Sequence, residues 1–131
     1  MAGYETERQI FEARMSAQWK TTSIAWDNDD FIPTPGTAWV RFTIINSDAN
    51  NASLGSNILI RDTGFLDIGI FVPVGTGTNT ARGYVDTIAA IFRNWSSGGI
   101  TCKAPVIKRV GELNGWFQYN VTVPFDRDTT F

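Results

Sequence analysis

The sequence predicts an α+β fold: a mostly antiparallel, twisted sheet packed by two helices, an α/β sandwich formed by a single domain over residues 1–131. Two segments, residues 5–20 and 81–95, place apolar residues at three- and four-residue steps, which is the helical period. Several other segments alternate apolar and polar residues, which is the period of a half-buried strand. These segments follow one another as helix, strands, helix, strands, an order typical of α+β folds.

The strongest element is the strand, glycine turn and helix of residues 65–95. Pro73 ends the strand because it has no N–H to donate, and Gly75 and Gly77 give the turn its freedom. A short side-chain oxygen of the Thr-Asn-Thr run at residues 78–80 is expected to cap the helix. The helix carries one apolar stripe, expected to seed the core: Ala81, Tyr84, Val85, Ile88, Ala89, Ile91, Phe92 and Trp95.

The first helix, residues 5–20, is expected to bury Phe11, Met15 and Trp19 and to be capped by Thr6. A short strand at Ala25-Trp26 precedes the acidic run of residues 27–30. That run lacks the alternation and closing Glu of a calcium loop, so it is interpreted as a solvated turn.

Residues 38–46 are predicted to form a strand. A polar loop, residues 47–57, is expected to follow, as either a mobile tip or an interaction loop. The next strand begins at residues 58–62, and Gly64 is expected to bend it before it continues from Phe65.

After the second helix, residues 96–99 are expected to form a turn, and short edge strands surround Pro105. The Asn-Gly pair within residues 112–115 predicts a hairpin into the last strand. The strands expected here cover residues 100–103, 106–110 and 116–125. Residues 126–131 are expected to be a tail.

Two helices can cover only one face of this sheet, and the other face is rich in aromatic residues. Its expected members are Trp39, Arg41, Ile45, Phe65, Phe71, Trp116 and Gln118. Aromatic residues and Arg among polar ones are typical of protein–protein interfaces. Two interpretations stay open: the face is an interface, or loops or the N-terminal segment fold over it.

The composition argues against catalysis. There is no histidine, so histidine-based nucleophile activation and the usual zinc sites are excluded. The carboxylates do not pair usefully, and the single Cys102 is interpreted as a half-buried strand thiol. Gly75-Thr-Gly77 precedes a helix but lacks the third glycine and the acidic ribose partner of a dinucleotide site. No enzyme activity, cofactor or metal is therefore expected.

The net charge of −2 includes no basic run that would attract nucleic acid or an anionic membrane. No apolar run approaches the roughly 20 residues that span a bilayer, and the polar N-terminus does not resemble a signal peptide.

An ordered set of short pieces, covering nearly the whole chain, resembles the tail-terminator-like proteins of long-tailed bacteriophages. Near the N-terminus these pieces are Phe11, Trp26, Phe31-Ile-Pro33, Gly36 and Trp39-Val-Arg41. Through the middle they are Leu54-Gly55, Arg61, Gly64, Ile70-Phe71-Val-Pro73, Gly75-Thr-Gly77 and the helix end Ile88-Ala-Ala-Ile91-Phe92-Arg93. The last are Gly99, Pro105, Gly111, Gly115-Trp116-Phe117-Gln118-Tyr119-Asn120-Val121 and Pro124-Phe125.

The resemblance implies a non-enzymatic virion protein of the tail or neck, assembled in the host cytoplasm. It implies a homo-oligomeric ring, usually of six subunits, that caps the tail tube, stops its polymerisation and provides the surface that joins the head. The implied partners are the tail tube protein and a head–tail connector or neck protein. DNA would pass through the ring without sequence-specific recognition, and no membrane is involved.

With this resemblance, the aromatic face becomes a candidate intersubunit interface. The polar loop becomes a candidate contact with the tube or a neighbouring ring, through Asp48, Asn50, Asn51 and Leu54. An alternative from another class is a small-ligand or carbohydrate-binding domain, in which Trp39, Trp116 and Tyr119 stack on sugar rings. That alternative requires a concave aromatic site.

Overall fold

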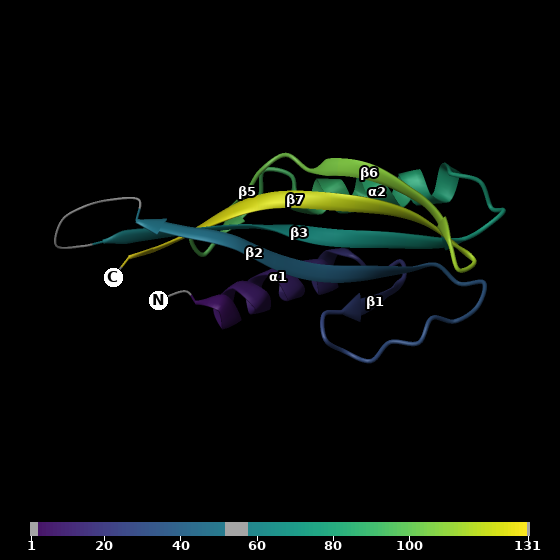
Figure 1. The fold of residues 1–131 in the computed structure, drawn as a ribbon, viewed down its shortest axis with the longest axis horizontal. Helices are drawn as coiled ribbons and strands as arrows, with labels where there is room; N and C mark the ends of the chain where they lie inside the picture. The colour runs from purple at the N-terminus through teal and green to yellow at the C-terminus, as the bar shows by residue number, and fades with distance from the viewer. Residues whose placement is uncertain (1–2, 52–57, 131) are drawn as a thin grey trace.

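The computed structural model describes residues 3–51 and 58–130. Two helices and seven strands follow one another along these described residues (Figure 1). In order they are α1 (Tyr4–Gln18), β1 (Ser23–Trp26), β2 (Trp39–Asn51), β3 (Leu59–Pro73), α2 (Asn79–Phe92), β4 (Ser96–Ser97), β5 (Ile100–Cys102), β6 (Val106–Leu113) and β7 (Trp116–Thr130).

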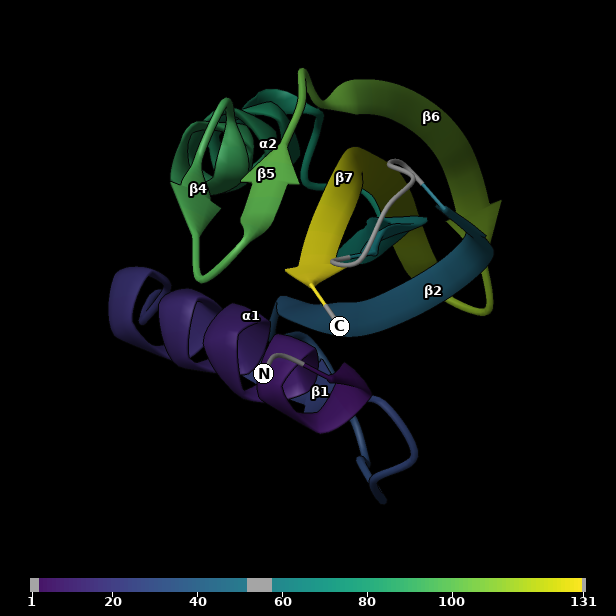
Figure 2. The ribbon, with the colours of Figure 1, turned by 90° about the vertical axis from the view of Figure 1, so that its left-hand side faces the viewer.

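The strands form one strongly curled sheet in the order β1-β2-β3-β7-β5-β4, with β6 also paired to β7. Strand β1 is parallel to β2, and every other pairing is antiparallel. Figure 2 shows β2 and β6 curving round opposite sides of the central strands β3 and β7. The predicted α+β fold with a mostly antiparallel sheet is confirmed.

Both helices pack on the same face of the sheet, where the core lies. Helix α2 buries most of the predicted stripe, with Ile88 and Phe92 fully inaccessible and Tyr84 half-buried. Helix α1 meets this stripe through Phe11, whose ring centroid is 6.2 Å from that of Phe92 and 4.8 Å from that of Phe125. Trp95 lies beyond the end of α2, yet its ring still packs 6.2 Å from Phe11.

The predicted side-chain caps are wrong. Gly3 is the N-cap of α1, so Thr6 lies inside the helix, and the structure has no side-chain hydrogen bond at either N-cap. Thr78 occupies the N-cap of α2 with helical backbone angles, φ −100° and ψ −7°. A capping side chain normally needs an extended backbone to reach the free N–H groups of the first turn, and Thr78 does not have one.

The two polar segments predicted as loop and tail are partly wrong. Residues 47–51 belong to β2, and residues 126–130 belong to β7. They pair with the first part of β3, so that Asp48 lies opposite Thr63 and Asp62 lies opposite Arg127. Strand pairing satisfies the backbone here, and the exposed polar side chains of β2 need no core. The rest of the predicted loop, including Leu54, lies outside the described residues.

Gly64 does not interrupt β3, which runs unbroken from Leu59 to Pro73. A Cβ at this position would lie 2.5 Å from the carbonyl oxygen of Ile45. The glycine is therefore required for the close approach of β3 to β2. Next to it, the ladder between β2 and β3 shifts register between Asn46 and Asp48, as in a β-bulge.

The predicted hairpin is confirmed, although β6 runs three residues further than expected, to Leu113. Asn114 and Gly115 both have positive φ, 53° and 85°, the geometry of a two-residue turn that suits twisted strands. The turn expected at residues 96–99 instead contains β4, which pairs with β5 around Gly98 and Gly99.

Replacing Ile88 with Asp should unfold the protein. Ile88 has no accessible surface, and an unpaired charge there costs several kcal/mol out of a total stability of about 5–15 kcal/mol. Thermal unfolding followed by circular dichroism measures the effect. Asp86→Ala, on the exposed side of the same helix, is the control and should melt like the wild type. An Ile88→Asp protein that melted like the control would contradict the core assignment.

Candidate assembly surfaces

An aromatic cluster lies at one end of the sheet face that the helices leave uncovered. It consists of Phe31, Trp39, Phe71 and Trp116. Trp39 and Phe71 are opposite one another on β2 and β3, and their rings stack with centroids 4.1 Å apart and planes 8° apart. The ring centroid of Trp116 lies 5.9 Å from that of Trp39, in an edge-to-face arrangement. Phe31, in the loop between β1 and β2, has its ring centroid 5.1 Å from that of Trp39.

Two polar members of the predicted interface join this cluster. The guanidinium carbon of Arg41 lies 5.1 Å from the centre of the Phe71 ring, within reach of a cation–π contact, and the Arg41 side chain is exposed. Gln118, opposite Phe71 on β7, is buried and donates a hydrogen bond of 2.7 Å to Asn120 Oδ1. These five of the seven predicted residues, namely Trp39, Arg41, Phe71, Trp116 and Gln118, therefore form one group.

The loop between β1 and β2 partly covers this group. Phe31 packs on Trp39, and Phe71 is only 7% exposed. The structure thus shows part of the covering that the sequence left open as an alternative. Trp39 Nε1 is buried and has no hydrogen-bond partner among the described residues, while Arg41 and part of Trp116 stay accessible.

The other two predicted interface residues lie apart from the cluster. Ile45 and Phe65 are opposite one another on β2 and β3, three ladder positions beyond the pair formed by Phe42 and Ile68. Ile45 is 37% exposed. They share the uncovered face with the cluster but do not contact it through any aromatic pair that the structure shows.

The predicted contact loop becomes the outer half of a long strand. Asp48, Asn50 and Asn51 are all exposed, and Asn50 lies opposite Arg61 on β3. Figure 1 shows this part of β2 continuing beyond the start of α1. The residues predicted to contact another protein are therefore presented on a paired strand, except Leu54, which lies outside the described residues.

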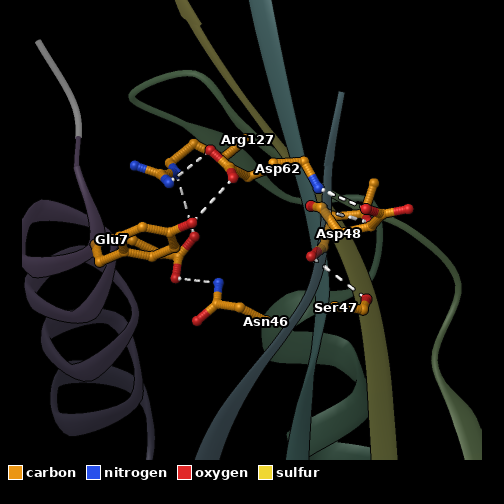
Figure 3. A network of polar contacts seen from close by, with 9 residues as sticks. Glu7, Asn46, Ser47, Asp48, Asp62 and Arg127 are labelled. Carbon is orange, nitrogen blue, oxygen red and sulfur yellow. Dashed lines mark hydrogen bonds and ion pairs between the residues drawn. The ribbon is translucent and has the colours of Figure 1, made fainter. Parts of the chain in front are cut away.

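A buried ionic network fastens α1 to this same end of the sheet (Figure 3). Arg127 on β7, 2% exposed, contacts two carboxylates: its Nη2 donates to Asp62 Oδ2 at 2.8 Å, and its Nε lies 3.2 Å from Glu7 Oε1. Asn46 donates to the second oxygen of Glu7 at 3.0 Å, and the Tyr4 hydroxyl donates to Asp62 at 3.1 Å. The network thus joins α1, β2, β3 and β7.

The network has the character of a structural tie. Burial raises the pKa of Glu7, although Asn46 and Arg127 oppose that rise. Each carboxylate faces the same guanidinium, and a charge-assisted pair of this kind is costly to break when buried. These residues lie far apart in the chain, so no local sequence pattern brings them together. The alternation of Phe125, Arg127 and Thr129, which continues the strand period, was the available signal.

Within residues 3–51 and 58–130, no group of three or more His, Cys, Asp or Glu residues could hold a metal ion. Cys102 is buried, more deeply than expected, and burial raises the pKa of its thiol to about 12. Within the same ranges, no helix is long and apolar enough to cross a membrane.

The aromatic residues of the sugar-binding alternative do not share one site. Tyr119 is 3% exposed and belongs to the core on the helix side of the sheet, whereas Trp39 and Trp116 lie on the uncovered face. The flat face of Trp39 is already stacked on Phe71. The three side chains therefore cannot stack together on one ligand.

Comparison with protein families matches residues 8–125 to the family described as phage tail terminator protein. The chain belongs to the phage tail terminator family. The resemblance noted from the ordered sequence pieces is thereby confirmed. Members of this family are structural proteins of bacteriophages, so this tail terminator is assigned to the virion as a structural component.

The fold of this tail terminator is also found among solved structures. One solved structure superposes with a TM-score of 0.72 at 18% sequence identity, covering 97% of this chain and 96% of that chain. At this identity the likeness concerns the fold alone. No curated protein matches the sequence.

Glu7→Gln should change how the stability of the tail terminator depends on pH. A carboxyl group whose folded pKa is raised contributes stability that is present below its unfolded pKa and is lost as the pH rises through the folded pKa. Gln cannot ionise, so the stability of the variant relative to the wild type should increase as the pH rises above about 4, the ordinary pKa of a Glu side chain. Urea unfolding followed by Trp fluorescence at several pH values measures the difference.

Glu5→Gln, on the exposed side of the same helix, is the matched control for that experiment. Its stability relative to the wild type should not show the same rise. If the difference in stability between Glu7→Gln and the wild type did not change as the pH rises, the raised pKa of Glu7 would be contradicted.

Proposed function

We propose that this tail terminator forms a ring, of six copies, that caps the completed tail tube and stops its polymerisation. The ring then offers the surface to which the head is joined. The observation that carries the proposal is the family match over residues 8–125, which spans the helices and nearly the whole sheet. The partners under this proposal are the tail tube protein and a head–tail connector or neck protein, with assembly in the host cytoplasm.

The uncovered sheet face supports contacts between subunits. It presents the exposed guanidinium of Arg41 beside half-buried aromatic rings, and aromatic residues and Arg are enriched in interfaces. Ile45, which is 37% exposed, extends the apolar area of this face along β2. The exposed outer half of β2 supports a contact with the tube or a neighbouring ring through Asp48, Asn50 and Asn51.

The ring is tested by size-exclusion chromatography with light scattering, followed by negative-stain electron microscopy, in the presence and absence of the tail tube protein. We expect rings at the ends of tubes, and shorter tubes when the terminator is added during polymerisation. A protein that stays monomeric even with tubes present would contradict the proposal. A monomer without tubes would not, because some ring proteins assemble only on their template.

Arg41→Glu should weaken assembly while leaving the fold intact. Because the Arg41 side chain is exposed, reversing its charge should have a small effect on folding. The substitution nevertheless removes the cation that lies beside the aromatic cluster. Light scattering measures assembly and thermal melting measures folding. Arg93→Glu, an equally charged change at an exposed position after α2, is the control and should assemble normally. Arg41→Glu rings of normal yield would exclude this group from the interface.

Trp39→Ala is less discriminating than Arg41→Glu. Trp39 stacks on Phe71 and contacts Phe31 and Trp116 within its own chain. Its truncation therefore removes internal packing as well as any contact with a neighbour, and a loss of rings would not separate the two effects.

A further inference from the structure

Strand β6 is exposed on both of its faces. Seven of its eight residues are exposed, and the exception is Gly111. Figure 2 shows it curving away from both helices, so neither layer of the fold covers it. Four of its residues are large and apolar with 42% to 63% of their surface accessible: Val106, Ile107, Val110 and Leu113.

The outer edge of β6 is also open for strand pairing. Among the described strands, β6 pairs with β7 alone, so alternate residues direct their N–H and C=O groups outward. An exposed, apolar edge strand is a template for pairing with another chain. Lys108 and Arg109, offset in part by Glu112 nearer the other end of the strand, give β6 a net positive charge.

The opposite side of the sheet has a second open edge. Strand β1 is only four residues long and pairs with β2 from Trp39 to Phe42. Beyond Phe42, no other described strand pairs with this edge of β2, which leaves residues 43–51 open. This stretch is about as long as β6, carries the carboxylate of Asp48, and is exposed from Ile45 onward.

The strand directions fit a contact between the two open edges. Strands β2, β3, β7 and β6 alternate in direction, because each neighbouring pair is antiparallel. In a closed ring, each subunit is related to the next by the same rotation, so the β6 edge of one subunit meets the β2 edge of the next. If the strands run roughly along the ring axis, this rotation keeps their directions. Strand β2 of one subunit is then antiparallel to β6 of its neighbour. The alternation continues across the boundary.

The register of the sheet sets how far the copies must be staggered. Val106 on β6 is level with Thr43 on β2, through the pairs Val106–Thr122, Thr122–Asp67 and Asp67–Thr43. Strand β6 must therefore move along the neighbour toward Asn51. Closed sheets tilt their strands by about 35–45°, which over four strands gives a stagger of roughly four to six residues. A stagger of six would place β6 beside the open stretch of β2.

Charge selects the opposite edge over a second β6. If two β6 edges paired, Lys108 and Arg109 of one subunit would lie near the same cations of the other subunit and repel them. If β6 paired with β2, these cations would lie near the carboxylate of Asp48. We infer that the outer edge of β6 pairs antiparallel with residues 43–51 of β2 in an adjacent copy, so that one sheet continues from subunit to subunit. This inference rests on the proposed ring.

Charge-swapped variants test the pairing. One chain carries Lys108→Glu and Arg109→Glu on β6, and the other carries Asp48→Lys and Asn50→Lys on β2. All four positions are exposed, so both proteins should melt like the wild type. We expect neither to form rings alone, because each brings like charges together at the boundary. An equimolar mixture should recover rings, since acidic β6 edges then meet basic β2 edges and basic β6 edges meet acidic ones.

The control matched to the β6 variant is Lys20→Glu with Arg82→Glu, which makes the same change in net charge as that variant, away from both open edges, and should form rings alone. Light scattering and negative-stain images, with the tail tube protein present, are the readout. If the wild type forms no rings, the proposed function fails. If the wild type forms rings, the edge pairing is overturned when either edge variant alone assembles normally, or when the mixture does not recover rings.

Discussion

The pairing of β3 with β7 is the interaction on which the rest of the structure depends. The two strands are each fifteen residues long and stay in register from Leu59–Thr130 to Pro73–Trp116. On one side their alternate residues supply the floor of the core, including Ile68 and Val121, which are fully buried under the helices. On the other side the same strands present Phe71, Trp116 and Gln118. A single ladder therefore positions both the core and the uncovered face.

The helices cover only part of what this ladder supports. The core extends over β2, β3 and β7, while β6 and the outer half of β2 lie beyond it. Backbone pairing, rather than burial of apolar area, holds these outer parts in place. Beside the outer half of β2, Arg61 on β3 and Asp128 on β7 form an ion pair at 2.8 Å, and the Arg61 guanidinium holds the pKa of Asp128 below its usual range. The buried contact of Arg127 with Glu7 and Asp62 then ties the N-terminal helix to the same end.

Much of the fold could be predicted from the sequence because apolar periodicity reports burial. The stripe on α2, the inward residues of β7 and the Asn114-Gly115 turn follow from periodicity and turn chemistry alone. The polar ends of β2 and β7 could not be predicted in this way. Their strand conformation comes from partners distant in sequence, such as Arg127 opposite Asp62, and no local pattern records such a partner.

The candidate surfaces were predicted only in part for the same reason. Alternation correctly placed Trp39, Phe71 and Trp116 on one face, but it did not reveal that Phe31, from an irregular loop, packs against them. The open edge of β6 was also not evident, because its apolar residues read like those of any short strand. Whether a strand is exposed depends on which part of the sheet the helices cover, and this is decided only when helices and sheet pack together.

The position of β7 also constrains the order in which the protein can fold. Strand β7 lies between β3 on one side and β5 and β6 on the other, so the middle of the sheet is completed by a strand that is synthesised after the other described strands. Most of its contacts join residues far apart in sequence, which makes them slow to form. Until β7 pairs, the edge of β3 that it occupies has no partner strand. A chain of this tail terminator that has not yet added β7 therefore has an open strand edge in the middle of its sheet, which favours aggregation.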